Sequence, residues 1–161
     1  MTKALTSFAL VAVLTAALMA LSLAVARHGY PFGTVGAKRL EGIADAAVFL
    51  PLAGVYFLAA MLMMILPLRA ASFMLLNAAD TLFWTAVALL AAIVGCAAAR
   101  WAFGERDALL TLWNWRLLAA AALFAAHLAM NELRRNVLLR SLFLVIFAAA
   151  TLACLFWSFT L

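Results

Sequence analysis

Long runs of apolar residues, separated by short polar breaks, make up most of this chain. The runs lack the alternation of apolar and polar residues, with a period of two, that marks the strands of a membrane barrel. Only helices and closed barrels can cross a bilayer, because every backbone polar group must be bonded within the protein there. The pattern therefore predicts an all-α polytopic transmembrane bundle. It predicts a single integral membrane domain over residues 1–161, with five spans at about 4–26, 42–66, 71–99, 109–130 and 137–159.

A four-span alternative stays open, in which one run is signal-like or re-entrant. The first run ends in Ala24-Val25-Ala26, which resembles the small-residue cleavage site of a secretory signal. The run is nevertheless as long as a complete span, which needs about 20 apolar residues. We therefore expect residues 4–26 to be the first transmembrane helix.

The breaks between the runs contain the residues that most often interrupt helices. Gly29, Pro31, Gly33 and Gly36 predict a loop over residues 27–41. Residues 67–69 are expected to form a tight turn between the second and third spans. Pro51, inside the second span, is expected to kink it.

Composition supports the membrane interpretation. Hydrophobic residues make up 71% of the chain and charged residues 11%, and the mean hydropathy is +1.20. A soluble domain of this size carries more charge on its surface. The net charge of +5 does not indicate a nucleic-acid partner, because the basic residues are scattered at the ends of apolar runs instead of clustering on one soluble face. The expected partners are the lipid bilayer and other membrane subunits.

The basic residues also bear on orientation. Five spans would place five of them on the side of the N-terminus and six on the other, which decides little under the positive-inside rule. The basic group at 134–140 and Lys3 before the first span favour a cytoplasmic N-terminus. We expect an integral protein of a bacterial inner membrane. The first side would hold Lys3, Arg69, Arg134, Arg135 and Arg140, and the second Arg27, Lys38, Arg39, Arg100, Arg106 and Arg116.

Polar residues inside the third span are the first candidates for a functional site. Asn77, Asp80 and Thr81 have the i, i+3, i+4 spacing that puts side chains on one helix face. A carboxylate at the centre of a membrane helix costs about 2.5–3.5 kcal/mol even on the lenient scale, so its presence needs a reason.

The fourth span ends in a second polar stripe. His127, Asn131 and Arg134 follow i, i+4, i+7 spacing on one helix face. At ~1.5 Å per residue, Asp80 lies roughly 13 Å into the third span and His127 about 5 Å from the end of the fourth, both near the same leaflet. We therefore expect one polar cluster, made by Asn77, Asp80, Thr81, His127, Asn131 and Arg134.

Three roles are open for this cluster. Its side chains can hydrogen-bond across helices and fix their register, at around 0.6–2 kcal/mol each. They can bind a quinone or a lipid headgroup, since histidine and carboxylate can bond carbonyl oxygens and exchange protons. They can also form a proton or ion step in transport, because intramembrane ionisable groups mark such paths.

Haem and metal sites are not expected. A haem held by two histidines would need His28 and His127, which five spans place on opposite sides of the membrane. Cys96 and Cys154 lie in apolar runs without a neighbouring ligand, so packing is their expected role. Glu41 and Asp45, at i and i+4, indicate a solvated helix start.

The expected function follows from these features. The sequence has no nucleophile elbow and no HExxH motif, so we expect no catalytic activity of the chain alone. Short loops and runs of small residues, such as Ala91, Ala92 and Gly95, favour a small accessory or anchor subunit of a larger membrane complex. The alternatives are a quinone-linked or proton-linked membrane protein acting through Asp80 and His127, and a small solute transporter.

Overall fold

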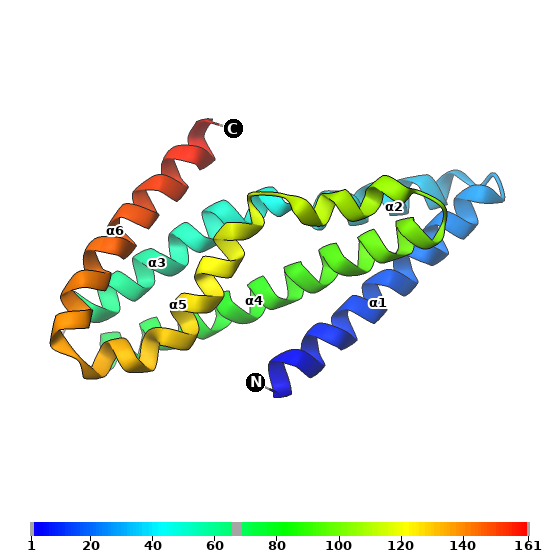
Figure 1. Cartoon of the computed structure of the whole chain (residues 1–161). Helices are drawn as coiled ribbons and strands as arrows, with labels where there is room; N and C mark the ends of the chain where they lie inside the picture. Colours follow the sequence, from blue (N-terminus) through cyan, green and yellow to red (C-terminus); the bar gives the residue numbers. More distant parts are fainter. Residues whose placement is uncertain (1, 66–68, 161) are drawn as a thin grey trace. The chain divides into compact units, whose positions relative to one another are not determined.

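A computed structural model describes residues 2–65 and 69–160, with the side chains of 69–72, 131, 133, 134 and 160 left out of the description. Within these ranges the chain consists of helices joined by short turns (Figure 1). The elements in chain order are α1 (Thr2–Arg27), α2 (Pro31–Ile43), the 3-10 helix η1 (Ala46–Val48), α3 (Phe49–Ile65), α4 (Arg69–Ala102), the 3-10 helix η2 (Arg106–Trp113), α5 (Leu117–Arg135) and α6 (Val137–Thr160).

The expected helical membrane bundle is confirmed. Four helical stretches in the described ranges are long and apolar enough to cross a membrane, and a bent pair made by η2 and α5 would be a fifth. The number of spans is therefore four or five, as the sequence predicts. The four stretches are Thr2–Arg27, Pro31–Ile65, Phe73–Ala102 and Val137–Phe159.

The helices form two compact units. The first contains the chain up to Ala46 together with Ala86–Leu117, and the second contains Ala47–Thr85 together with the chain from Leu118 onward. Helix α4 contributes its N-terminal half to the second unit and its C-terminal half to the first. Each unit is described separately below.

The first unit is built where α1, α2 and the C-terminal half of α4 meet. Met19 of α1 is fully buried, and it packs with Ala37 of α2 and with Cys96 and Ala99 of α4. The partners of Met19 are small, so the helix backbones approach closely. Arg27 closes the end of this unit, because its guanidinium donates to the Phe103 carbonyl oxygen at 2.7 Å and lies over the Phe103 ring.

The prediction of a loop over residues 27–41 is wrong. Only the segment between Arg27 and Pro31 is a turn, where Gly29 has a φ of +85° that a residue with a side chain rarely adopts. Gly33 serves close packing: a Cβ atom there would collide with the Ala26 backbone of α1. Gly33 therefore permits close contact between α2 and α1 and does not interrupt the helix.

Pro51 does not kink a helix, so that expectation is also wrong. The second predicted span is interrupted six residues earlier, at Asp45, between α2 and η1. Pro51 is the third residue of α3. The first four N–H groups of a helix have no partner within it, so a proline in this turn removes no hydrogen bond of α3.

This placement gives a stability prediction. Pro51→Ala should change the free energy of unfolding by no more than about 1 kcal/mol. Leu58→Pro, in the middle of the same helix, should cost about 3 kcal/mol or more because it removes an interior hydrogen bond. Unfolding in mixed detergent micelles, followed by circular dichroism, measures both; equal losses would contradict the position of Pro51 in the first turn.

The boundaries of the predicted fourth span also differ from those in the structure. The expected fourth span, 109–130, is divided by a break at residues 114–116, and α5 continues to Arg135 before Asn136 separates it from α6. The expected turn at 67–69 lies largely outside the described residues.

The second unit has an aromatic core. Helix α3 packs along α6 through the Phe57 and Phe147 rings, which stack with centroids 5.4 Å apart. Gly54 of α3 leaves room for Cys154 of α6. Both cysteines are buried and free, in agreement with a packing role.

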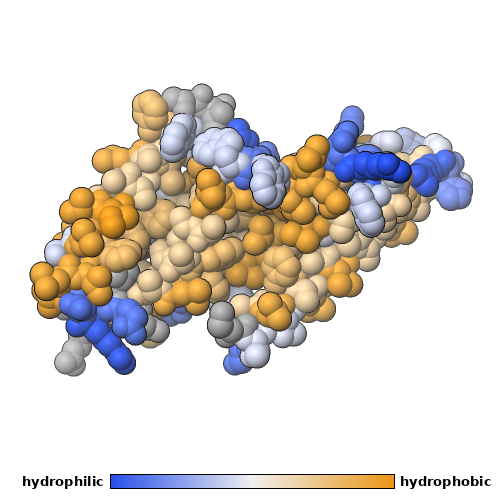
Figure 2. All heavy atoms as spheres, viewed as in Figure 1, coloured by the Kyte–Doolittle hydropathy of each residue, from blue (hydrophilic) through white to orange (hydrophobic). Residues whose placement is uncertain are grey.

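Large apolar side chains cover much of the protein surface, as the orange areas of Figure 2 show. Helix α1 is the clearest case, since only Met19 is buried along its length. An apolar surface of this extent suits lipid, not water, and this supports assignment to a membrane.

Candidate functional site

His127 of α5 and Asp80 of α4 face each other within the second unit. The His127 Nε2 atom lies 3.6 Å from Asp80 Oδ1, which is close enough for an ion pair and slightly long for a direct hydrogen bond. The Asp80 side chain is 51% exposed, whereas that of His127 is 23% exposed. The carboxylate therefore lies at the edge of the unit and the imidazole lies further inside.

Tyr56 of α3 holds the other side of the imidazole. Its hydroxyl oxygen lies 3.0 Å from His127 Nδ1, and the tyrosine side chain is fully buried. A buried tyrosine hydroxyl needs a hydrogen-bond partner, and His127 supplies it. Three helices thus contribute one polar group each to a continuous chain, which we call the Tyr56–His127–Asp80 chain.

Phe83 fixes the plane of the imidazole. Its ring stacks on His127 with centroids 4.1 Å apart and an interplanar angle of 12°. Phe124 meets the same phenyl ring edge-on at 5.6 Å. Since Phe83 is three residues after Asp80 on α4, the helix that supplies the carboxylate also supplies the ring that orients its partner.

The contacts favour one arrangement of protons. When the Tyr56 hydroxyl donates to Nδ1, neutral His127 carries its proton on Nε2, and this N–H points toward the Asp80 carboxylate. Both ring nitrogens then have a partner. The imidazole can pass a proton between its two sides, because each nitrogen can be either donor or acceptor.

The chemistry available here is proton exchange at a partly exposed carboxylate. Asp80 and His127 are both ionisable residue types, and the Tyr56 hydroxyl restrains the imidazole. Such a pair can act as general acid and base toward a molecule placed at the outer side of Asp80.

Asn77 and Thr81 lie on α4 with Asp80, but in the described contacts neither of them bonds to His127. The Thr81 hydroxyl donates to the Asn77 carbonyl oxygen of its own helix at 2.8 Å. Both side chains are exposed, on the side of α4 that also exposes Asp80. They form a polar face of α4, which we call the Asn77–Asp80–Thr81 face.

The other residues predicted from the sequence are Asn131 and Arg134 of the cluster and the second histidine, His28. The side chains of Asn131 and Arg134 lie outside the described residues, so their part in the cluster stays a prediction. His28 is exposed at the end of α1, where its Nδ1 atom lies 2.8 Å from the Ala24 carbonyl oxygen. His28 belongs to the first unit and His127 to the second.

Sequence reasoning missed Tyr56 and Phe83. Tyr56 had a detectable signal, because a tyrosine inside an apolar run must find a partner for its hydroxyl. Phe83 had none, because nothing in the sequence distinguishes it from the other aromatic residues of the spans.

The hydroxyl of Tyr56 can be tested directly. Tyr56→Phe should lower the free energy of unfolding by about 1 kcal/mol, because it leaves His127 Nδ1 without its partner. It should also shift the nitrogen resonances of His127 in NMR spectra of protein labelled in its two histidines. Tyr30→Phe is the matched control, since Tyr30 is the only other tyrosine and is exposed. Equal effects of the two variants would contradict the contact.

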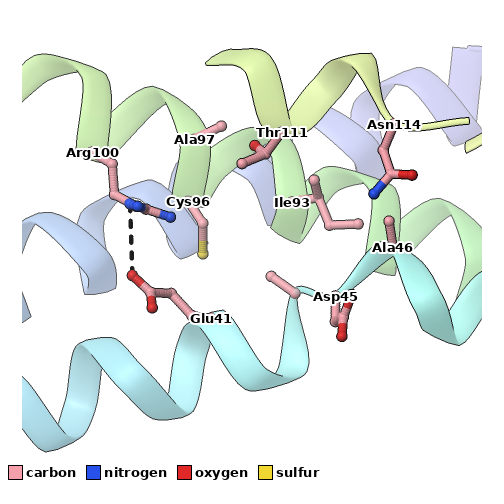
Figure 3. A pocket seen from close by; sticks show the side chains of 10 residues that line it. Glu41, Asp45, Ala46, Ile93, Cys96, Ala97, Arg100, Thr111 and Asn114 are labelled. Carbon is pink, nitrogen blue, oxygen red and sulfur yellow. Dashed lines mark ion pairs between the residues drawn. The ribbon is translucent and has the colours of Figure 1, made fainter. Parts of the chain in front are cut away.

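The first unit contains a separate polar pocket beside α4 (Figure 3). Its walls come from the end of α2 and start of η1, the last turns of α4, and η2 with the residue after it. Arg100 and Glu41 face each other across it with 3.6 Å between Nε and Oε1. Glu41 lies in the last turn of α2 and not at a helix start as the sequence indicates, and its side chain is 44% exposed. Among the described residues, no three histidine, cysteine or acidic side chains gather as a metal site.

Comparisons with known proteins do not place this chain in a family. No protein family, no characterised protein and no solved structure is significantly similar to this chain.

Proposed function

We propose that this chain is a proton-exchanging membrane protein, and that the Tyr56–His127–Asp80 chain binds a lipid-soluble carbonyl compound of the quinone class. The observation that carries the proposal is the imidazole held on both sides, by a buried hydroxyl at Nδ1 and a half-exposed carboxylate beyond Nε2. Ionisable groups in membrane helices are rare and are by default candidates for function.

The surroundings of Asp80 suit a ligand that arrives through lipid. Asp80 lies within the candidate span Phe73–Ala102, and Trp84, one turn further along, is exposed. A quinone ring can rest against such an aromatic surface while its carbonyl oxygen accepts a hydrogen bond from the His127 Nε2–H group or from protonated Asp80.

Quinone reduction would also require electrons. Converting a quinone to a quinol consumes two protons and two electrons, and the proposed site supplies only the protons. The electrons would come from a redox centre on a partner subunit. The proposal is therefore compatible with membership in a larger membrane complex.

An accessory subunit without a ligand of its own is the second candidate. The observation that favours it is the exposed Asn77–Asp80–Thr81 face, because polar side chains on the outside of a membrane helix are commonly covered by a neighbouring helix. The small residues of α4 do not add to this argument, since Gly95 packs against α1 of the same chain. The solute-transporter alternative stays a prediction.

Fluorescence of Trp84 provides the binding test. In a variant that keeps Trp84 and replaces the other four tryptophans with phenylalanine, a short-chain quinone should quench the emission with saturation. Asp80→Asn and His127→Gln should each raise the half-saturating concentration by up to about tenfold, since each disturbs one hydrogen bond to the quinone carbonyl oxygen. Asp107→Asn, an exposed aspartate in η2, is the control and should bind as well as the parent.

The outcomes separate the two candidates. Quenching that never saturates, or that is equal in all variants, would reject the quinone site. A partner that co-purifies in mild detergent with the parent but not with Asp80→Asn would then support the accessory role. A stable monomer without any partner would reject that role as well.

A further inference from the structure

Helix α2 carries charged residues just before an apolar segment that is long enough to cross the membrane. The candidate span Pro31–Ile65 has 35 residues, whereas crossing the hydrocarbon core takes about 20. Its charged residues all lie between Lys38 and Asp45, and the part that follows, η1 and α3, has none. This distribution places the charged part of α2 at the level of the lipid headgroups, since charged side chains are costly deeper in the membrane.

The packing of α2 on α1 agrees with this depth. Ala37 of α2 packs with Met19 of α1 in the core of the first unit. At ~1.5 Å per residue, Met19 lies about 26 Å from the first residue of α1, and the hydrocarbon core is about 30 Å thick. Lys38 and Arg39 follow Ala37 directly, so their long side chains reach the headgroups at the far edge of the core.

The side of α2 that faces away from α1 combines apolar and basic side chains. Phe32, Val35 and Ile43 are exposed at 81%, 49% and 62%. Arg39 is also exposed and lies four residues from both Val35 and Ile43, a spacing that puts the three on one stripe. Lys38 is exposed beside this stripe. We call these five residues the outer face of α2.

The two cations of the outer face are not neutralised by direct contact. Within the described part of the chain, neither Lys38 nor Arg39 takes part in an ion pair or a hydrogen bond of its side chain. The nearest carboxylate along the helix, that of Glu41, is paired with Arg100 at 3.6 Å between Oε1 and Nε. Glu105 also pairs with Arg100, at 2.6 Å. Two adjacent positive charges therefore remain for a negative partner.

We propose that the outer face of α2 binds anionic phospholipids. The Arg39 guanidinium matches phosphate oxygens with paired N–H groups, and the Lys38 ammonium adds a second positive charge. Acyl chains cover Phe32, Val35 and Ile43 on the same face. A free phosphate or a nucleic acid would leave these apolar side chains in water, so a lipid satisfies both parts of the face.

The outer face of α2 should select lipids by their net charge. Phosphatidylglycerol carries a net negative charge, whereas the headgroup of phosphatidylcholine is neutral because its own ammonium offsets the phosphate. Each basic residue near an anionic membrane surface contributes a gain of about fivefold in affinity. The preference should weaken as salt is added, since ions screen exposed charges.

Two measurements on the purified full chain test the proposal. Native mass spectrometry counts the lipids retained after exchange into detergent that contains equal amounts of phosphatidylglycerol and phosphatidylcholine. Thermal unfolding in detergent is followed with dioctanoyl phosphatidylglycerol, with dioctanoyl phosphatidylcholine and with sodium phosphate at equal concentrations. We expect severalfold preferential retention of phosphatidylglycerol, and a rise in unfolding temperature with dioctanoyl phosphatidylglycerol only.

Variants connect these results to the outer face of α2. The double variant Lys38→Gln, Arg39→Gln should lower the preference for phosphatidylglycerol by about tenfold or more. The double variant Lys3→Gln, Arg135→Gln is the matched control, because it removes the same charge from exposed positions outside this face. It should keep the preference of the parent. Phe32→Ser leaves every charge in place and should lower the retention of phosphatidylglycerol, because the acyl chains lose an apolar contact.

A preference that the Lys38→Gln, Arg39→Gln variant loses supports the proposal, with or without a rise in unfolding temperature. Equal retention of the two lipids by the parent, or the same preference in the parent and this variant, would overturn it. So would an equal response to sodium phosphate, which identifies a site for a free anion. Equal lipid retention together with a protein that co-purifies only with the parent would assign the face to a protein partner instead. The face belongs to the first unit, so failure here leaves the proposed function standing.

Discussion

Replacing Asp80 with asparagine should strongly slow the proton uptake that accompanies reduction of a bound quinone by an added chemical reductant, while the helices remain folded. Asparagine has nearly the same shape as aspartate but does not ionise, so the Tyr56–His127–Asp80 chain loses its outer proton-exchanging group. General acid–base groups contribute about 10²–10⁴-fold to rates, so we expect at least a hundredfold loss. A pH-indicator dye in weakly buffered proteoliposomes measures the exchange.

The control is again Asp107→Asn, which removes an exposed carboxylate from η2 of the first unit. It should leave the exchange unchanged. Circular dichroism of Asp80→Asn should match that of the wild type, since the substitution removes no backbone hydrogen bond. Wild-type exchange rates in Asp80→Asn would mean that the carboxylate has only a structural role.

The second large effect concerns stability and falls on Gly95. Gly95→Ala should lower the free energy of unfolding by about 1–3 kcal/mol, because the added Cβ would meet the backbone of α1 at Ala12 and Ala16. Backbone atoms of a packed helix cannot rotate away as the end of a side chain can. Helix α1 must therefore shift away from α4, and the buried Met19 of α1 loses contacts with Cys96 and Ala99 of α4.

Gly42 is the matched glycine for this experiment. It lies in α2, and a Cβ atom built there meets no atom within 4 Å. Gly42→Ala should stabilise the protein by at most about 1 kcal/mol, the usual gain from replacing a helical glycine. Chemical unfolding in mixed micelles compares the two variants; similar changes in both would contradict the close contact between α1 and α4.

The fold class was predictable because the bilayer restricts it. Apolar runs of about 20 residues without strand periodicity leave helices as the remaining choice, and the described ranges consist of helices joined by short turns. The helix boundaries were less predictable. In sequence, Gly33 and Gly36 resemble loop residues. In the structure both lie in α2, where Gly33 packs directly against the backbone of α1.

The proximity of Asp80 and His127 followed from depth alone. Two consecutive antiparallel helices bring residues near the same leaflet together, and the structure places the two side chains 3.6 Å apart. The rotation of each helix about its own axis could not be predicted in the same way, because amphipathic patterns are weak when both faces of a helix are apolar. That rotation decides that Tyr56 and Phe83 contact the imidazole.

Infrared difference spectroscopy on the reconstituted protein tests the central claim most directly. Adding a short-chain quinone should change the carbonyl stretching band of a protonated carboxyl group, since the site is proposed to exchange a proton at Asp80. The account predicts that this band change is present in wild type and in Asp107→Asn and is absent in Asp80→Asn. Identical difference spectra for all three proteins would contradict it.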